Sequence, residues 1–364
     1  MKNTENIKTA LYEEHVKLDG KMIPFAGYIM PVNYTHGIKN EYKSIRNDIG
    51  VFDVSHMGYI KISGQESEHL LNFITTNNVS KISDYSAQYN TICKSDGGTI
   101  DDIIVYRVNK ESYFIIVNAS NINKDYNWII DNNNFNCKVE NLSKFKSLIA
   151  IQGPNSRKKI FEIFNLDLKG LEFYKFIESN LFNEKLIISR TGYTGELGFE
   201  LIANHDVIVK IWKILIKNNI QPCGLGVRDI LRMEMKYCLY GNDLLENINP
   251  IQANLKWIVD FGKENFIGKK KLLEEFDNPT KRLLCFRMID RAIPRKGYNV
   301  FFENKNIGVV SSGSFSLGLS KGIGLAFIKA EYIKNKNIFI EIRKELFKAE
   351  IIKPPFIDKF SLHS

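Results

Sequence analysis

Two adjacent carboxylates, Asp101 and Asp102, are residues whose type and position could do chemistry. They lie between the stretch Asp96-Gly97-Gly98 and an apolar run at 103–105. The glycines predict a hairpin turn, because glycine tolerates positive φ, and the apolar run predicts a buried strand. A carboxylate that opens a buried strand is costly to desolvate unless it has a partner or a function. Adjacent strand residues point to opposite faces, so at most one of these acids faces a given pocket, and ordinary turn chemistry stays open for the pair.

A glycine-rich stretch at 191–200 holds two further acids, Glu196 and Glu200. Its glycines let the backbone approach a flat or bulky group closely. If the segment is extended, Glu196 and Glu200 lie on the same face and could act together. A tight hairpin with solvated acids is the alternative.

A helix is predicted after the glycines at 224 and 226, and Arg228 falls in its first turn. A cation at that position opposes the helix dipole. We therefore interpret Arg228 as a candidate ligand for a carboxylate or carbonyl group. The G-x-G pattern alone is a weak signal, and the spacing typical of nucleotide binding is absent.

Metal and nucleophile chemistry find little support in the sequence. The five cysteines include no pair with C-x-x-C spacing, and the six histidines are scattered. Neither a disulfide framework nor a metal site is indicated. His56 is isolated from other ligand-type residues and is interpreted as a structural histidine. Its neighbour Ser55 lacks the G-x-S-x-G motif of a nucleophilic serine.

Composition bounds the class of protein. The 364 residues predict two or three domains, and 44% hydrophobic with 25% charged residues is typical of globular proteins. No apolar run is long enough to span a membrane, and the first residues resemble neither a signal nor a transit peptide, so a cytoplasmic protein is expected. The net charge of +9 comes from lysines spread along the chain rather than clustered with aromatic residues. Nucleic-acid binding is therefore not expected.

Hydrophobic patterning predicts helices at about 37–48, 64–76, 121–131, 155–164 and 205–218, and strands at about 59–62, 88–93, 113–117, 147–151, 185–189 and 198–202. Residues 9–35 are interpreted as irregular, and the polar stretch 275–282 as a linker. Six further strands between 283 and 355 predict a small all-β domain. This mixture favours α+β layers with antiparallel sheets over a doubly wound fold.

Six segments, taken in order, resemble the glycine cleavage T-protein family, the aminomethyltransferases. They are FDVSHM at 52–57, GGTIDD at 97–102, IQGP at 151–154, GYTGELGFE at 192–200, GVRD at 226–229 and CLYGND at 238–243. The resemblance implies an α+β, three-domain cloverleaf around a central folate-binding hole. Residues 1–53 and 137–275 would form a discontinuous first domain, residues 54–136 an inserted second domain, and residues 283–364 a C-terminal β-barrel-like domain.

The resemblance also implies an enzyme. Members of the family move an aminomethyl group from the lipoyl arm of H-protein to tetrahydrofolate, which is a co-substrate, and no metal is required. The products are 5,10-methylenetetrahydrofolate, ammonia and dihydrolipoyl H-protein. The basic chain would suit two anionic partners, the polyglutamate tail of folate and the carrier protein.

By resemblance, Asp102 is the catalytic acid. Carbon transfer develops iminium character, which a nearby carboxylate can stabilise, and the same group can orient or accept a proton from the folate amines. Glu200 is assigned to the pterin edge, whose adjacent N–H donors match a bidentate carboxylate. Arg228 is placed either near the pterin carbonyl or beside Glu200, which it would brace.

Four further residues match family positions around the folate. Tyr89, Tyr193 and Met57 match its walls, and Asn118 matches a polar contact. For Met57 and Tyr89, a role in the core alone is the open alternative. A C-terminal tyrosine can reach the site in the family, but the tail at 355–361 has no tyrosine.

Three alternatives share this fold. A folate-binding scaffold that supports iron–sulfur cluster assembly carries a Lys-Gly-Cys-aromatic-x-Gly-Gln-Glu motif, from which KYCLYGND at 236–243 departs. The folate domain of a sarcosine- or dimethylglycine-oxidising enzyme accompanies a flavin domain, for which 364 residues leave no room. A folate-binding module without catalytic activity is the third.

Overall fold

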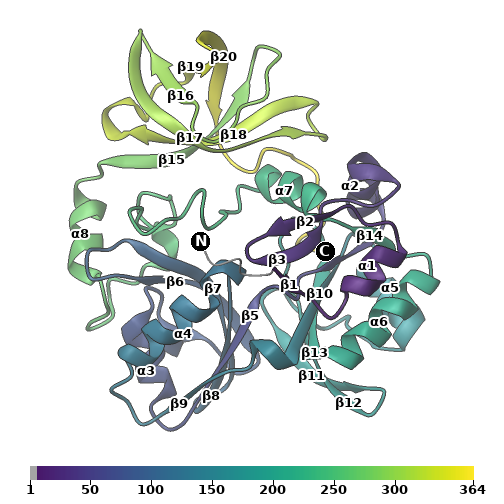
Figure 1. The fold of residues 1–364 in the computed structure, drawn as a ribbon. Helices are drawn as coiled ribbons and strands as arrows, with labels where there is room; N and C mark the ends of the chain where they lie inside the picture. The colour runs from purple at the N-terminus through teal and green to yellow at the C-terminus, as the bar shows by residue number, and fades with distance from the viewer. Residues whose placement is uncertain (1–5) are drawn as a thin grey trace.

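The computed structural model describes residues 6–364, which form three lobes (Figure 1). Two lobes each combine a β-sheet with helices, and the third is a β-barrel, so the predicted α+β class is confirmed. Among the described residues, no helix has both the length and the apolar character that crossing a bilayer requires. The expectation that the chain starts without a leader peptide rests partly on residues 1–5, which lie outside the described residues.

The first lobe contains a six-stranded sheet in the order β11-β12-β13-β10-β4-β14. These strands span, in that order, Phe176–Leu181, Glu184–Ser189, Gly198–Asn204, Lys146–Gln152, Gly50–Asp53 and Gln221–Cys223. Neighbours are antiparallel except β4 and β14, which are parallel. The inner strands are buried and rich in isoleucine and leucine, as expected for a sheet that helices cover on both faces.

Helices cover this sheet because their apolar residues recur at helical spacing. On α6 (His205–Lys217) the buried side chains are Val207, Ile208, Ile211, Trp212 and Leu215. They pack with β10 and β13 in one core, which α5 (Ser156–Phe164) and α1 (Tyr12–Lys17) border. A second core contains Ile45 of α2 (Gly37–Asn47) and Val227 of α7 (Leu225–Glu234). That core also takes in Tyr106 and Phe114 of the second lobe, so the two sheets share buried surface.

The second lobe contains a five-stranded antiparallel sheet in the order β6-β7-β8-β5-β9. These strands span Ser86–Cys93, Thr99–Asn109, Ser112–Val117, Gly58–Ser63 and Lys138–Asn141, and α3 (Ser67–Ile74) and α4 (Ile122–Asp131) pack on them. The predicted hairpin turn joins β6 to β7 with Gly97 at φ +86°. Since β9 completes this sheet, we propose that the inserted domain extends to Asn141 rather than ending at residue 136.

The interpretation of residues 9–35 as irregular is wrong. A three-stranded sheet in the order β1-β3-β2 forms here, from Ile7–Lys8, Tyr28–Pro31 and Met22–Phe25, and α1 lies between β1 and β2. The strands are at most four residues long, and Pro24 and Pro31 interrupt their pattern. Strands this short carry too little alternation to be recognised.

The barrel is closed by six strands in the order β15-β18-β17-β16-β19-β20. They span Lys281–Met288, Lys321–Lys329, Lys305–Ser316, Asn299–Phe302, Asn337–Ile342 and Glu345–Ile352, so this part of the chain forms six strands as predicted. The predicted linker is much shorter than expected, because α8 (Lys269–Asp277) extends into it and only 278–280 separate α8 from β15.

One buried ion cluster joins the barrel and the chain end to the first lobe; we call it the Arg46 hub. The Arg46 guanidinium on α2 pairs with Glu196 (2.7 Å) and with Glu234 of α7 (2.6 Å). Glu234 also accepts from Ser316 of the barrel (2.6 Å), and Glu196 from the backbone and hydroxyl of Ser361 (2.8 and 2.5 Å). All of these contacts satisfy carboxylates that are almost completely buried.

We expect Arg46→Ala to lower the free energy of unfolding by about 3–5 kcal/mol, because Glu196 and Glu234 would stay buried without a counter-ion. Chemical denaturation measures the change. Lys43→Ala, on the same helix but exposed, is the matched control, with an expected change below about 0.5 kcal/mol. Equal effects of the two substitutions would contradict the role assigned to the hub.

Candidate functional site

A cavity of about 360 Å³ lies between the first two lobes and the segment that follows α7. All seven side chains singled out in the sequence line it: Met57, Tyr89, Asp102, Asn118, Tyr193, Glu200 and Arg228. They come from widely separated parts of the chain, and both sheets contribute. The structure therefore brings the predicted residues together, and their individual roles stay predictions.

Asp102 faces this cavity, whereas its neighbour Asp101 does not line it. The two acids lie near the start of β7, opposite Thr91 and Ile92 of β6, and point to different sides as expected for a strand. Asp102 Oδ2 accepts a hydrogen bond from the Tyr89 hydroxyl at 2.9 Å. Turn chemistry belongs instead to Asp96, whose Oδ1 accepts from the Gly98 amide at 2.9 Å.

The Asn118 side chain links the two acids. Its Nδ2 donates to Oδ1 of Asp101 and to Oδ1 of Asp102, both at 2.9 Å. Burial, together with the negative charge of Asp101, raises the pKa of Asp102 to about 7. The cavity thus contains a carboxyl group that exchanges a proton near neutral pH, which is the property required of a general acid or base.

Glu200 reaches the cavity from β13, and its Oε2 accepts from the Thr191 hydroxyl at 2.5 Å. The expectation that Glu196 shares a face with Glu200 is wrong. The chain before Gly198 is a loop in which Gly195 has φ +81°, so the two acids are not related by strand alternation. Glu196 points instead into the Arg46 hub.

Arg228 lies one turn into α7, and its guanidinium carbon is 4.6 Å from the centroid of the Tyr193 ring. The alternative in which Arg228 braces Glu200 is not observed, because no hydrogen bond joins them among the described residues. Burial lowers the pKa of the guanidinium, and its Nη1 has no hydrogen-bond partner in the part of the chain described. A buried donor without an acceptor is costly, so this atom is suited to bind a ligand oxygen.

His56 is a cavity residue that sequence reasoning missed. It was interpreted as structural because no other ligand-type residue is near it in sequence. Its ring is buried on the cavity wall, and Nδ1 has no partner among residues 6–364. Burial and the charge of Arg228 lower its pKa to about 4, so the imidazole is neutral at pH 7. The available signal was its place beside Met57, between β4 and β5.

The C-terminal tail does not line this cavity. Ser361 bonds to Glu196, and the Leu362 carbonyl accepts from Arg190 Nη2 at 2.6 Å. The tail therefore ties the barrel to the first lobe, and residues 355–364 do not reach the cavity.

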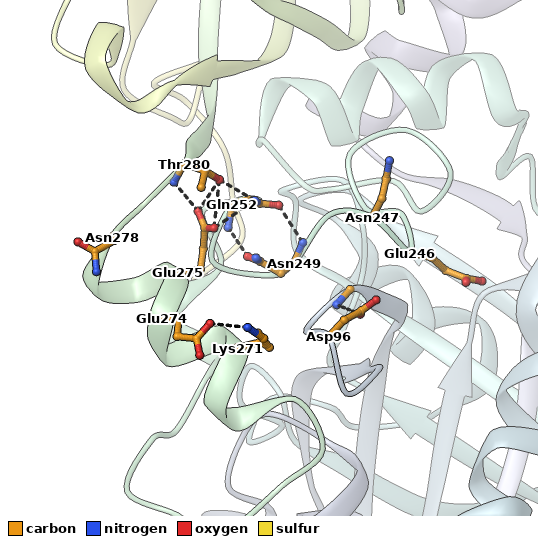
Figure 2. A pocket seen from close by; sticks show the side chains of 11 residues that line it. Asp96, Glu246, Asn247, Asn249, Gln252, Lys271, Glu274, Glu275, Asn278 and Thr280 are labelled. Atoms are coloured by element: carbon orange, nitrogen blue, oxygen red, sulfur yellow. Dashed lines mark hydrogen bonds and ion pairs between the residues drawn. The ribbon is translucent and has the colours of Figure 1, made fainter.

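A larger cavity, of about 520 Å³, is polar and lies beside α8 and the β6–β7 turn (Figure 2). Lys271 pairs with Glu274 at 2.7 Å, and Glu275 accepts from the Thr280 amide at 2.7 Å. None of the seven predicted residues lines it. Size therefore does not identify the functional cavity here.

The structure also bears on whether the chain could bind a metal ion. Within the residues that the structure describes, no group of three or more His, Cys, Asp and Glu side chains is arranged to hold a metal ion. The five cysteines are free thiols. Cys238 lines the cavity, and burial raises the pKa of its thiol to about 12.

Comparisons with known proteins agree along the chain. The GCVT N-terminal domain family matches residues 11–263, and the glycine cleavage T-protein C-terminal barrel domain family matches residues 281–358. The aminomethyltransferase of Thermosipho melanesiensis is 45% identical over 351 residues, which cover 96% of each chain. That of Halothermothrix orenii is 43% identical over 356 residues, 96% of this chain and 99% of the relative.

A solved structure shares the whole fold. The crystal structure of glycine cleavage system aminomethyltransferase T from Bartonella henselae superposes with a TM-score of 0.91 at 28% identity. The match covers 98% of this chain and 99% of that one, so both sheets and the barrel are included. The chain therefore belongs to the glycine cleavage T-protein family, a family of aminomethyltransferases.

Proposed function

We propose that this chain transfers an aminomethyl group from the lipoyl arm of H-protein to tetrahydrofolate. Ammonia, 5,10-methylenetetrahydrofolate and dihydrolipoyl H-protein are the products. The observation that carries the proposal is the convergence of three groups on one cavity: the Asp102 carboxyl, the Glu200 carboxylate and the unpartnered Arg228 Nη1. Family membership supports the class of reaction.

The cavity residues fit a reduced folate. Met57 and the aromatic side chains of the lining suit a flat ring system. Glu200 uses Oε2 to accept from Thr191, which leaves Oε1 for the N–H donors of a pterin edge. Arg228 Nη1 lacks an acceptor within residues 6–364, and a pterin carbonyl would supply one. Donors and acceptors of the chain thus complement those of the ligand.

Asp102 carries out the proposed chemistry with the help of two neighbours. Tetrahydrofolate, when bound, supplies the nucleophilic nitrogen that takes up the carbon unit. The Asp102 carboxylate stabilises the positive charge that develops during transfer and can accept a proton at Oδ2. The Tyr89 hydroxyl and the Asn118 amide hold this carboxylate in one orientation through hydrogen bonds of 2.9 Å each. Neutral His56 adds no charge that would compete with the developing cation.

The net charge of the chain bears on its proposed partners. An acidic carrier protein and the polyglutamate tail of folate would both be attracted to a chain with a net charge of +9. We propose that electrostatic attraction speeds the encounter with an acidic carrier protein, and that added salt slows it. No nucleic acid or membrane partner is proposed.

The iron–sulfur scaffold is not favoured. Its motif has a cysteine where this chain has Cys238, but the raised pKa of that buried thiol suppresses the thiolate. The carbonyl of Cys238 accepts from the Tyr193 hydroxyl, so the residue has a structural role in the cavity wall.

Asp102→Asn is expected to lower the rate of transfer by about 10²–10⁴-fold while tetrahydrofolate still binds, because the amide can neither accept a proton nor balance a positive charge. The assay follows ammonia and methylenetetrahydrofolate after mixing with aminomethyl-loaded H-protein. Asp131→Asn, exposed on α4, is the control. A wild-type protein that binds folate but releases no ammonia would overturn the proposed function.

Asp102→Asn should also stabilise the fold at alkaline pH. The pKa of Asp102 is about 7 in the folded chain and about 3.9 when unfolded. Between these values the folded chain binds more protons, so wild-type stability falls as pH rises, and the loss is complete above about pH 7. The variant's advantage should grow over this range to on the order of 1–4 kcal/mol in denaturation experiments. An advantage independent of pH would argue against a perturbed Asp102.

Glu200→Gln should weaken tetrahydrofolate binding about 10- to 100-fold, because a charge-assisted hydrogen bond is replaced by a neutral one. Isothermal titration calorimetry measures the affinity. Glu178→Gln, on the exposed side of β11, is the matched control. Equal affinities of the two variants would remove Glu200 from the folate site.

A further inference from the structure

A third acid lies behind the pair on β7. Asp125, in the first turn of α4, is completely buried. Both of its carboxyl oxygens are buried without an N–H or O–H donor among the described residues, and its carboxyl group lies within interaction distance of that of Asp101. It lies outside the cavity and contacts no proposed ligand, so the proposed chemistry leaves it without a role.

Two carboxyl groups can share a hydrogen bond only if one of them carries a proton. Asp101 accepts three N–H donors, from the Asn118 backbone (2.9 Å), Asn118 Nδ2 (2.9 Å) and Asn121 Nδ2 (2.7 Å). Asp125 accepts from no N–H or O–H donor of the described residues. Donors stabilise the ionised form, so Asp101 is the anion and Asp125 is the protonated acid.

The charged groups near Asp125 agree with an ionised Asp101 and a protonated Asp125. Asp125 faces Asp101, Asp102 and Lys124, and the Lys124 ammonium is turned toward the Tyr240 hydroxyl at 2.7 Å. Burial and the charge of Asp101 raise the pKa of Asp125 to about 11. Tyr89, Tyr174, Tyr193, Cys238, Tyr240 and Asp125 also interact electrostatically with Asp102. The guanidinium groups of Arg228 and Arg232 line the same cavity as Asp102.

We propose that Asp125 is a positioning residue for the role proposed for Asp102: it holds a proton and donates it in a hydrogen bond to Asp101. This bond keeps Asp101 ionised, and ionised Asp101 holds the Asn118 amide, which in turn holds Asp102. The inference rests on the proposed function, because it concerns the orientation and proton affinity of the acid that acts there. The charge of Asp101 then adds to the effect of burial, so that Asp102 exchanges its proton near neutral pH.

Infrared difference spectroscopy of the protein without folate tests the proton directly. At a pH well above the pKa of Asp102, about 7, the C=O band of a buried carboxylic acid should persist in the wild type. It should be unchanged in Asp131→Asn, on the same helix and exposed, and lose the component that belongs to Asp125 in Asp125→Asn. A band of unchanged position and intensity in Asp125→Asn would show that Asp125 carries no proton and overturn the proposal.

The pH profile of the transfer rate tests the positioning role. Asp125→Ala removes the donor, so Asp101, whose pKa burial already raises, takes up a proton and loses its charge. The acid limb of the profile should then move down by about one pH unit. Asp125→Asn keeps a neutral N–H donor and should restore the limb to its wild-type position. Lower activity with an unshifted limb in Asp125→Ala would indicate a purely structural role and overturn the proposal.

The two readouts separate this inference from the proposed function. The infrared band is measured without substrate, so it reports the proton on Asp125 whatever reaction the chain catalyses. A wild-type protein that releases no ammonia would end the proposed function and leave the infrared result standing. Full turnover by Asp102→Asn would end only the catalytic role of Asp102, and with it the positioning role of Asp125. An unchanged infrared spectrum, with Asp102→Asn inactive, would end only the role of Asp125.

Discussion

The site depends on the Asn118 amide, which bonds both to the buried carboxyl group of Asp101 and to the half-buried carboxyl group of Asp102. Two acids in sequence on an apolar strand would repel each other and lose hydration at considerable cost. Asn118 Nδ2 donates to both, at 2.9 Å each, and the Asn118 backbone donates to Asp101 as well. These donors exist because β8 runs directly into the short helix at Ala119–Asn121 and then α4. The strand–helix junction thus makes an otherwise unfavourable pair of charges stable.

The second constraint is that the cavity belongs to no single lobe. Asp102 comes from the second sheet, Glu200 from the first, and Arg228 from α7. The Arg46 hub fixes α7 against α2 and against the loop before β13, so the walls keep their distance from one another. Gly98 allows a further close approach: a Cβ there would lie 1.9 Å from the Glu246 carbonyl oxygen. The contacts that hold the lobes together therefore also set the geometry of the site.

Much of the fold could be predicted from the sequence, because long periodic elements and glycine turns are local signals. The β6–β7 hairpin, the barrel strands and the helices after 121 and 205 lie where expected. The two-residue strand Ile7–Lys8 could not be recognised, because it is defined only by its partner β3. Glu196 was misplaced because the conformation of its loop depends on a distant arginine, Arg46. The proton on Asp125 arises from a contact across 24 positions, which no local pattern reports.

The most direct test of the central claim, that Asp102 lies where folate reacts, is a crystal structure of this protein with tetrahydrofolate. We expect electron density for the pterin between Glu200 and Arg228, with its reactive nitrogen beside Asp102. Density in the polar cavity of Figure 2, with none beside Asp102, would contradict the claim.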